Sequence, residues 1–86
     1  MTTIKDKVVI ITGAGSGIGE ETAHILAADG AIVVAVDINN AETVADEIKE
    51  KGYEAFGATL DVTNAEQWED IKKRTLEKYG RIDALA

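Results

Sequence analysis

Short apolar runs alternate with helical patterns along the whole chain, and this alternation limits the fold more than any other feature. The apolar runs are rich in β-branched residues, which suits strands buried on both faces of a parallel sheet. Strands that alternate with helices of about 10–15 residues are typical of right-handed βαβ units. The sequence therefore predicts an α/β fold with the order βαβαβαβ. The expected strands are residues 7–12, 31–36, 53–60 and 81–86.

Three helical patterns separate these strands, and each one ends at a glycine, which accepts the left-handed backbone of a helix C-terminus. These glycines are Gly30, Gly52 and Gly80. Asn40 is a candidate N-cap of the second helix. Thr63 and Glu66 have the spacing of a capping box at the start of the third. The positions expected to face the sheet are Ile18, Thr22, Ile25 and Leu26 in the first helix, Ala41, Val44, Ala45 and Ile48 in the second, and Trp68, Ile71, Leu76 and Tyr79 in the third.

A glycine-rich turn joins the first expected strand to the first expected helix. Thr12, Gly13, Gly17 and Gly19 give it the pattern T-G-x-x-x-G-x-G. A helix N-terminus offers unpaired backbone N–H groups and the positive end of its dipole. Glycine lets a phosphate approach closely because it has no Cβ. The turn therefore predicts a pyrophosphate site, and the alternative is a glycine-rich connector without a ligand.

Two other phosphate-binding patterns fail on their spacing. A P-loop needs a lysine directly after its last glycine, but here Glu20 follows Gly19. A strict G-x-G-x-x-G that starts at Gly13 and Gly15 would need its third glycine where the chain has Ile18. The first mismatch argues against a nucleoside triphosphatase.

Asp37 follows the second expected strand, 18 residues after Gly19. A carboxylate at this place can accept hydrogen bonds from the adenosine ribose hydroxyls and would repel a 2′-phosphate. Ser16 and Ile38, where a basic residue could serve such a phosphate, are uncharged. NAD is therefore favoured over NADP, and the alternative is that Asp37 is a loop or capping residue.

Length and composition exclude several classes of protein. The 86 residues suggest one small domain. The net charge of −7 argues against nucleic acid as a partner. No apolar run is long enough to cross a membrane, and no signal-peptide pattern is present, so we expect a cytoplasmic protein. Cysteine is absent and His24 is the single histidine, so we expect no metal site and regard His24 as a surface or packing residue.

Residues 12–19, Asp37, Asp61 with Val62, and residues 82–85 together resemble the short-chain dehydrogenase/reductase family. The resemblance runs through essentially all 86 residues in the right order. Within the family, the chain is similar to the branch that contains 3-oxoacyl-carrier-protein reductases and glucose dehydrogenases. The resemblance implies a Rossmann-like parallel sheet with the strand order 3-2-1-4, as a truncated doubly wound fold. Residues 1–86 would form a single, partial NAD-binding domain.

The resemblance also implies a set of cofactor-binding residues. Those expected at the phosphate and ribose site are Gly13, Ser16, Gly17, Ile18 and Gly19, with Gly19 chiefly allowing close packing of the helix on the strand. Asp37 and Ile38 would flank the adenosine. Asp61 would bind the amino edge of adenine, and Val62 would border the ring. Without the resemblance, Asp61 reads equally well as a turn or N-cap residue.

Members of this family transfer a hydride between nicotinamide and a carbonyl or an alcohol. They use a tyrosine and a lysine in a Y-x-x-x-K arrangement, with a serine and an asparagine. Four residues after Tyr53 the chain has Gly57, and four after Tyr79 it has Asp83. We therefore name no catalytic residue. We expect the chain to be the N-terminal, NAD(H)-binding half of such an oxidoreductase and to be inactive alone.

The sheet of such a half would have an open edge and apolar surface. We therefore expect the chain to self-associate through the strand edge or the sheet face. The other expected partners are NAD(H) or adenine nucleotides. The alternative function is a non-catalytic nucleotide-binding or assembly module that pairs through this open edge.

Overall fold

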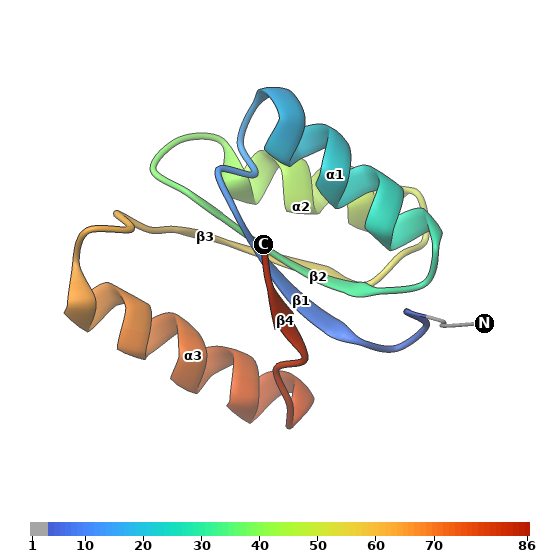
Figure 1. Cartoon of the computed structure of the whole chain (residues 1–86). Helices are drawn as coiled ribbons and strands as arrows, with labels where there is room; N and C mark the ends of the chain where they lie inside the picture. Colours follow the sequence, from blue (N-terminus) through green and yellow to red (C-terminus); the bar gives the residue numbers. More distant parts are fainter. Residues whose placement is uncertain (1–3) are drawn as a thin grey trace.

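A computed structural model describes residues 4–86 as one four-stranded parallel sheet between two layers of helices (Figure 1). The strands are β1 (Val8–Thr12), β2 (Ile32–Asp37), β3 (Ala55–Thr59) and β4 (Ala84–Leu85). The helices are α1 (Gly17–Ala28), α2 (Ala41–Glu50) and α3 (Ala65–Tyr79). The sheet order is β3-β2-β1-β4, and every pairing is parallel. The predicted fold class, element order and strand order are therefore confirmed.

The sheet is buried on both faces, which explains why its strands are apolar at consecutive positions. α1 and α2 lie on one face, over a core that includes Val9, Ile11 and Val33 (Figure 1). α3 lies on the opposite face, over Val8, Ile10 and Val34. Neighbouring residues of one strand thus enter different cores, because side chains alternate between the faces of a sheet.

The inner face of α1 differs from the prediction. Ile18 is 84% exposed and Ile25 is 54% exposed, whereas Ala23 and Ala27 are buried against the sheet. Alanine at the contact positions lets the helix axis lie close to the strands, and the larger side chains then flank the contact. The inner face of α2, by contrast, is as predicted, with Ala41, Val44, Ala45 and Ile48 all buried.

The inner face of α3 was predicted correctly except at one position. Trp68, Ile71 and Tyr79 pack against the sheet, but Leu76 is 49% exposed and Thr75 is buried in its place. Residues 68, 71, 75 and 79 form one stripe at helical spacing, and position 76 lies beside it. The Thr75 hydroxyl donates to the Ile71 carbonyl at 2.7 Å, which satisfies this polar group inside the core.

Of the two predicted N-caps, Asn40 is the N-cap residue of α2 as predicted, and Thr63 needs correction. Asn64, not Thr63, caps α3: its side-chain oxygen accepts the Gln67 N–H at 3.1 Å. Asn40 does precede α2, but its backbone is left-handed, with φ of 64°, and its side chain makes no capping hydrogen bond. Its backbone carbonyl instead accepts the Val44 N–H at 3.0 Å. The three glycines expected at the helix ends all have positive φ, as predicted.

β4 is shorter than the predicted strand at residues 81–86, and a side chain completes its pairing with β1. Asp83 accepts the Val8 N–H on its carboxylate at 2.8 Å and donates its own N–H to the Val8 carbonyl at 2.8 Å. Arg81 donates to the other carboxylate oxygen at 2.6 Å. These bonds, that from Arg81 above all, hold the pKa of Asp83 below its usual value. Regular pairing is therefore confined to Ala84 and Leu85.

Across residues 4–86, none of the helices combines the length and the apolar character that a membrane span requires.

Candidate functional site

The carboxyl ends of β1, β2 and β3 meet at one edge of the sheet and enclose a groove of about 260 Å³. We call this the strand-end groove; its lining residues are Thr12, Gly13, Asp37, Ile38, Leu60, Asp61 and Val62. Five of the nine residues predicted from the sequence therefore lie together in the groove. The other four, Ser16, Gly17, Ile18 and Gly19, lie in the turn and in the first turn of α1.

The glycine turn leads from β1 into α1 without a side-chain cap. Gly13 and Gly17 have φ of 66° and 58°, a conformation that favours glycine. A Cβ at Gly19 would overlap the Gly13 carbonyl oxygen, so the start of α1 lies directly against the turn. Ser16 is the N-cap residue, but its side chain makes no capping hydrogen bond. The N-terminal N–H groups of α1 therefore have no side-chain acceptor at Ser16.

Gly15 is a residue of this site that the sequence pattern missed. It is buried, and a Cβ there would overlap the backbone carbonyl oxygen of Asn39 and lie 2.9 Å from Asp37 Oδ2. The loop between β2 and α2 thus lies directly on the turn, and only glycine fits between them. The T-G-x-x-x-G-x-G pattern allows any residue at this position. The one sign in the sequence that glycine is needed here is that Gly15 continues the alternate spacing of Gly13, Gly17 and Gly19.

Asp37 is the last residue of β2, and both of its carboxylate oxygens accept backbone hydrogen bonds. Oδ2 accepts the Gly15 N–H at 2.9 Å. Oδ1 accepts the Ile38 N–H at 2.6 Å and the Asn39 N–H at 3.4 Å. The side chain of Ile38 is 60% exposed beside the groove. Asp37 therefore joins the glycine turn to the loop after β2.

Asp61 and Val62 follow β3 and line the same groove as Asp37 and Ile38. Asp61 Oδ1 accepts the Thr63 hydroxyl at 2.6 Å and the Thr63 N–H at 2.9 Å. These two bonds, the one from the hydroxyl first, hold the pKa of Asp61 below its usual value. Asp61 is thus a turn residue rather than an N-cap. The predicted capping box at the start of α3 would have needed the Thr63 hydroxyl, which bonds to Asp61 instead. Val62 is 50% exposed.

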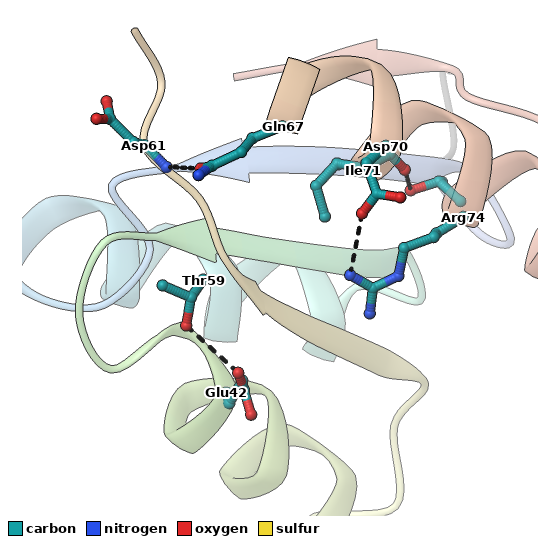
Figure 2. Close-up of polar contacts among 8 residues, drawn as sticks. Glu42, Thr59, Asp61, Gln67, Asp70, Ile71 and Arg74 are labelled. Carbon is teal, nitrogen blue, oxygen red and sulfur yellow. Dashed lines mark hydrogen bonds and ion pairs between the residues drawn. The ribbon is translucent and has the colours of Figure 1, made fainter. Parts of the chain in front are cut away.

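Two side chains from the first turn of α3 hold the loop that carries Asp61 and Val62. Gln67 Oε1 accepts the Asp61 N–H at 2.7 Å, and Figure 2 shows the Asp61 carboxylate pointing away from Gln67. The Trp68 indole N–H donates to the Val62 carbonyl at 2.9 Å. The sequence predicted Trp68 as a core residue but gave no sign of this second contact, nor of the role of Gln67.

The two tyrosines lie away from the groove. Tyr53 precedes β3 and is 40% exposed. Tyr79 is the last residue of α3, and its hydroxyl donates to the Glu54 carboxylate at 2.9 Å. Burial, followed by this bond to a carboxylate, raises the pKa of Tyr79 above its usual value. Neither tyrosine belongs to the residues that line the groove.

His24 links the two helices that cover one face of the sheet. Its Nε2 lies 3.2 Å from Glu47 Oε1, and Lys51 Nζ lies 3.0 Å from its Nδ1. Glu20 is close by, so one imidazole and two carboxylates offer ligand atoms within 4.8 Å of one another. With Lys51 at the second ring nitrogen, both ring nitrogens of His24 have hydrogen-bond partners within the chain. His24 is half-buried, so it is a packing residue between α1 and α2.

Comparison with known proteins identifies relatives along nearly the whole chain. The family model of the short chain dehydrogenases matches residues 7–86. An uncharacterized oxidoreductase of Listeria innocua is 44% identical over 85 residues, which are 96% of this chain and 34% of that protein. The 7α-hydroxysteroid dehydrogenase of Escherichia coli is 42% identical over 81 residues, which are 92% of this chain and 32% of that enzyme.

Solved structures give the same result. A 7α-hydroxysteroid dehydrogenase in complex with NADH and 7-oxo-glycochenodeoxycholic acid superposes with a TM-score of 0.91 at 40% identity, covering 96% of this chain and 33% of that one. A short chain dehydrogenase/reductase from Burkholderia phymatum in complex with NAD superposes with a TM-score of 0.93 at 32% identity, covering 99% of this chain and 31% of that one. The chain therefore spans about a third of the length of the relatives it matches.

Proposed function

Because the chain belongs to the short-chain dehydrogenase family, we propose that residues 1–86 are one partial Rossmann domain, which binds the adenosine diphosphate half of NAD(H) for an oxidoreductase. In the whole protein, the bound nicotinamide would exchange a hydride with a carbonyl or an alcohol. Two of the similar solved structures are complexes with NADH and with NAD. The 86 residues themselves would supply binding and orientation.

The observation that carries this proposal is the position of the glycine turn. Ligands of open parallel sheets bind outside the carboxyl ends of the strands, where the strand order reverses. Here β1 has β2 on one side and β4 on the other, so this reversal lies at β1. The turn follows β1 directly and opens α1 with no side-chain cap. Gly13, Ser16, Gly17, Ile18 and Gly19 would therefore receive the pyrophosphate on backbone N–H groups.

The lining of the strand-end groove supports its assignment as the adenosine site. On one side Asp37 would accept a hydrogen bond from a ribose hydroxyl on Oδ2, because within the chain this oxygen accepts only the Gly15 N–H and keeps a second lone pair. On the other side Asp61, whose pKa is lowered, stays charged at neutral pH and would accept the amino group of adenine. The exposed apolar side chains of Ile38 and Val62 would border the flat ring between these two carboxylates.

We expect NAD to bind more tightly than NADP. The segment of residues 37–40, Asp-Ile-Asn-Asn, carries one negative charge and no positive charge. A 2′-phosphate on the adenosine ribose would therefore meet the Asp37 carboxylate without a basic partner.

ADP-ribose and AMP are expected to compete for the site almost as well as NAD. The groove and the turn would contact only the adenosine and phosphate groups, so the nicotinamide would add little affinity to this chain. Isothermal titration of the 86-residue chain should give dissociation constants in the micromolar to millimolar range, about −8 to −4 kcal/mol. NAD that binds far more tightly than ADP-ribose would contradict the assignment, and a chain that binds none of the three would refute the proposed function.

A second candidate function is self-assembly, and one observation favours it. A second hollow, of about 250 Å³, lies between α3 and β4. Its lining residues are Ile10, Trp68, Lys72, Ile82 and Leu85. Leu85 is 62% exposed on this outer strand of the described sheet. Strands in this position tend to pair with another chain.

We expect the isolated 86-residue chain to associate through this surface, and Leu85→Glu to return it to a monomer. Sedimentation velocity over a concentration series measures this. Ile25→Glu is the matched control, because Ile25 is similarly exposed but lies on α1, which covers the opposite face of the sheet from α3, and this change should leave association unchanged. A wild-type chain that stays monomeric and melts cooperatively would exclude the assembly function.

A further inference from the structure

Asp37 makes contacts within the chain that binding of a ribose does not require. Gly15 is a buried residue, and its backbone N–H donates to Asp37 Oδ2 at 2.9 Å in a partly buried hydrogen bond. A buried N–H that loses its acceptor is costly. The residue before it, Ala14, is fixed by a backbone bond to the Val36 carbonyl at 3.2 Å. Asp37 therefore extends the attachment of the turn to β2 by one further residue.

The packing around Gly15 shows that this attachment leaves no free space. A Cβ on Gly15 would overlap the Asn39 carbonyl oxygen. The same loop is held by Asp37 Oδ1, which accepts the Ile38 N–H at 2.6 Å. One carboxylate thus fixes two backbone segments, the glycine turn and the loop after β2, against each other.

We propose that Asp37 positions the glycine turn through the Gly15 N–H, a role separate from its contact with the ribose. The phosphate-binding N–H groups that follow Gly15 would then depend on a side chain that never touches a phosphate. The part of this inference that concerns nucleotide affinity rests on the proposed function. The part that concerns the conformation of the glycine turn rests on the structure alone. The two parts can therefore be tested separately.

The first test measures amide hydrogen exchange of the Gly15 N–H by NMR, without ligand. Asp37→Ala removes the acceptor, and exchange should become about 10-fold faster or more, as expected for loss of a charge-assisted hydrogen bond. Asp37→Asn should give an intermediate rate, because its one amide oxygen can replace either Oδ2, which accepts the Gly15 N–H, or Oδ1, which accepts the N–H groups of the loop, but not both. Asp61→Ala is the matched control, since the Asp61 carboxylate bonds only to Thr63 and should leave Gly15 unchanged. Unchanged exchange at Val34 in β2 shows that the variants keep their fold.

The second test measures the affinity for 2′,3′-dideoxy-ADP, which has phosphates but no ribose hydroxyls. If Asp37 only contacted the ribose, Asp37→Ala would not weaken this ligand, and loss of a negative charge near the phosphates would favour it. If Asp37 positions the turn, the affinity should fall about 5-fold or more, with partial recovery in Asp37→Asn.

Each outcome supports or overturns the inference. Faster Gly15 exchange together with weaker dideoxy-ADP binding supports it. Unchanged exchange overturns it, and so does faster exchange with undiminished affinity. If the wild-type chain binds neither ADP nor dideoxy-ADP, the proposed nucleotide function fails, and the exchange rates alone decide whether Asp37 holds the turn.

Discussion

Gly19→Ala is expected to lower the affinity for ADP by more than about 100-fold. The added Cβ would overlap the Gly13 carbonyl oxygen, so the start of α1 must move away from the turn. Hydrogen bonds from backbone N–H groups to a charged phosphate contribute about 1.5–3 kcal/mol each, and displacement of the helix would weaken at least two of them. The crowding should also lower the free energy of unfolding by about 1–3 kcal/mol. Titration with ADP and urea unfolding measure the two effects.

Gly52→Ala separates the loss of binding from simple loss of stability. Gly52 also has a positive φ, of 92°, but a Cβ there meets nothing within 4 Å, and the residue lies outside the strand-end groove. This variant should lose about 1 kcal/mol or somewhat more of stability and keep its affinity for ADP. A folded Gly19→Ala chain that binds ADP as tightly as wild type would show that the start of α1 does not hold the phosphates.

Combining Asp37→Ser with Ile38→Arg is expected to reverse the nucleotide preference. Loss of the carboxylate removes an acceptor for the ribose hydroxyls and the repulsion of a 2′-phosphate. Arginine at position 38 adds a phosphate-binding group, and the 60% exposure of Ile38 means that no core contact is lost. Each change contributes about a factor of 10, so the ratio of NAD to NADP affinity should shift by about 100-fold.

The ratio of the two affinities is the proper readout for this double variant. Loosening of the glycine turn by loss of Asp37 would weaken both nucleotides alike and cancels in the ratio. Ile25→Arg adds the same charge on α1 at a residue outside the groove, so its ratio should match wild type. A wild-type chain that prefers NADP, or a double variant with an unchanged ratio, would contradict the assigned role of Asp37.

The sheet could be predicted from the sequence because its signals are local and strong. Consecutive apolar residues in the runs 7–12 and 31–36 leave no solvent-exposed face, which indicates strands covered on both sides. The order of the elements then restricts how the strands can be arranged. The helix faces were harder to predict: Ile18, Ile25 and Leu76 were expected inside because they are apolar. How closely a helix approaches a sheet depends on small residues such as Ala23, and apolarity alone does not show this.

The candidate site was predictable where one residue lies at the end of a strand, as Asp37 and Asp61 do. It was not predictable where two distant backbone segments touch. Gly15 must be glycine because Asn39, 24 residues later, folds over it, and no local pattern records that contact. The cap of α3 was missed for a related reason. Thr63 and Asn64 are both good capping residues, and in the structure the Thr63 hydroxyl bonds to Asp61 while Asn64 caps the helix.

The hydrogen bond from the Trp68 indole to the Val62 carbonyl gives the chain an optical reporter. Trp68 is the one tryptophan of the sequence, so its emission is not mixed with that of another indole. It is partly buried under the sheet, yet its N–H is tied to the loop that borders the strand-end groove. A shift of that loop would change the polarity around the ring. The intrinsic fluorescence of the unlabelled protein should therefore report movement of the loop at Val62, which lines the strand-end groove.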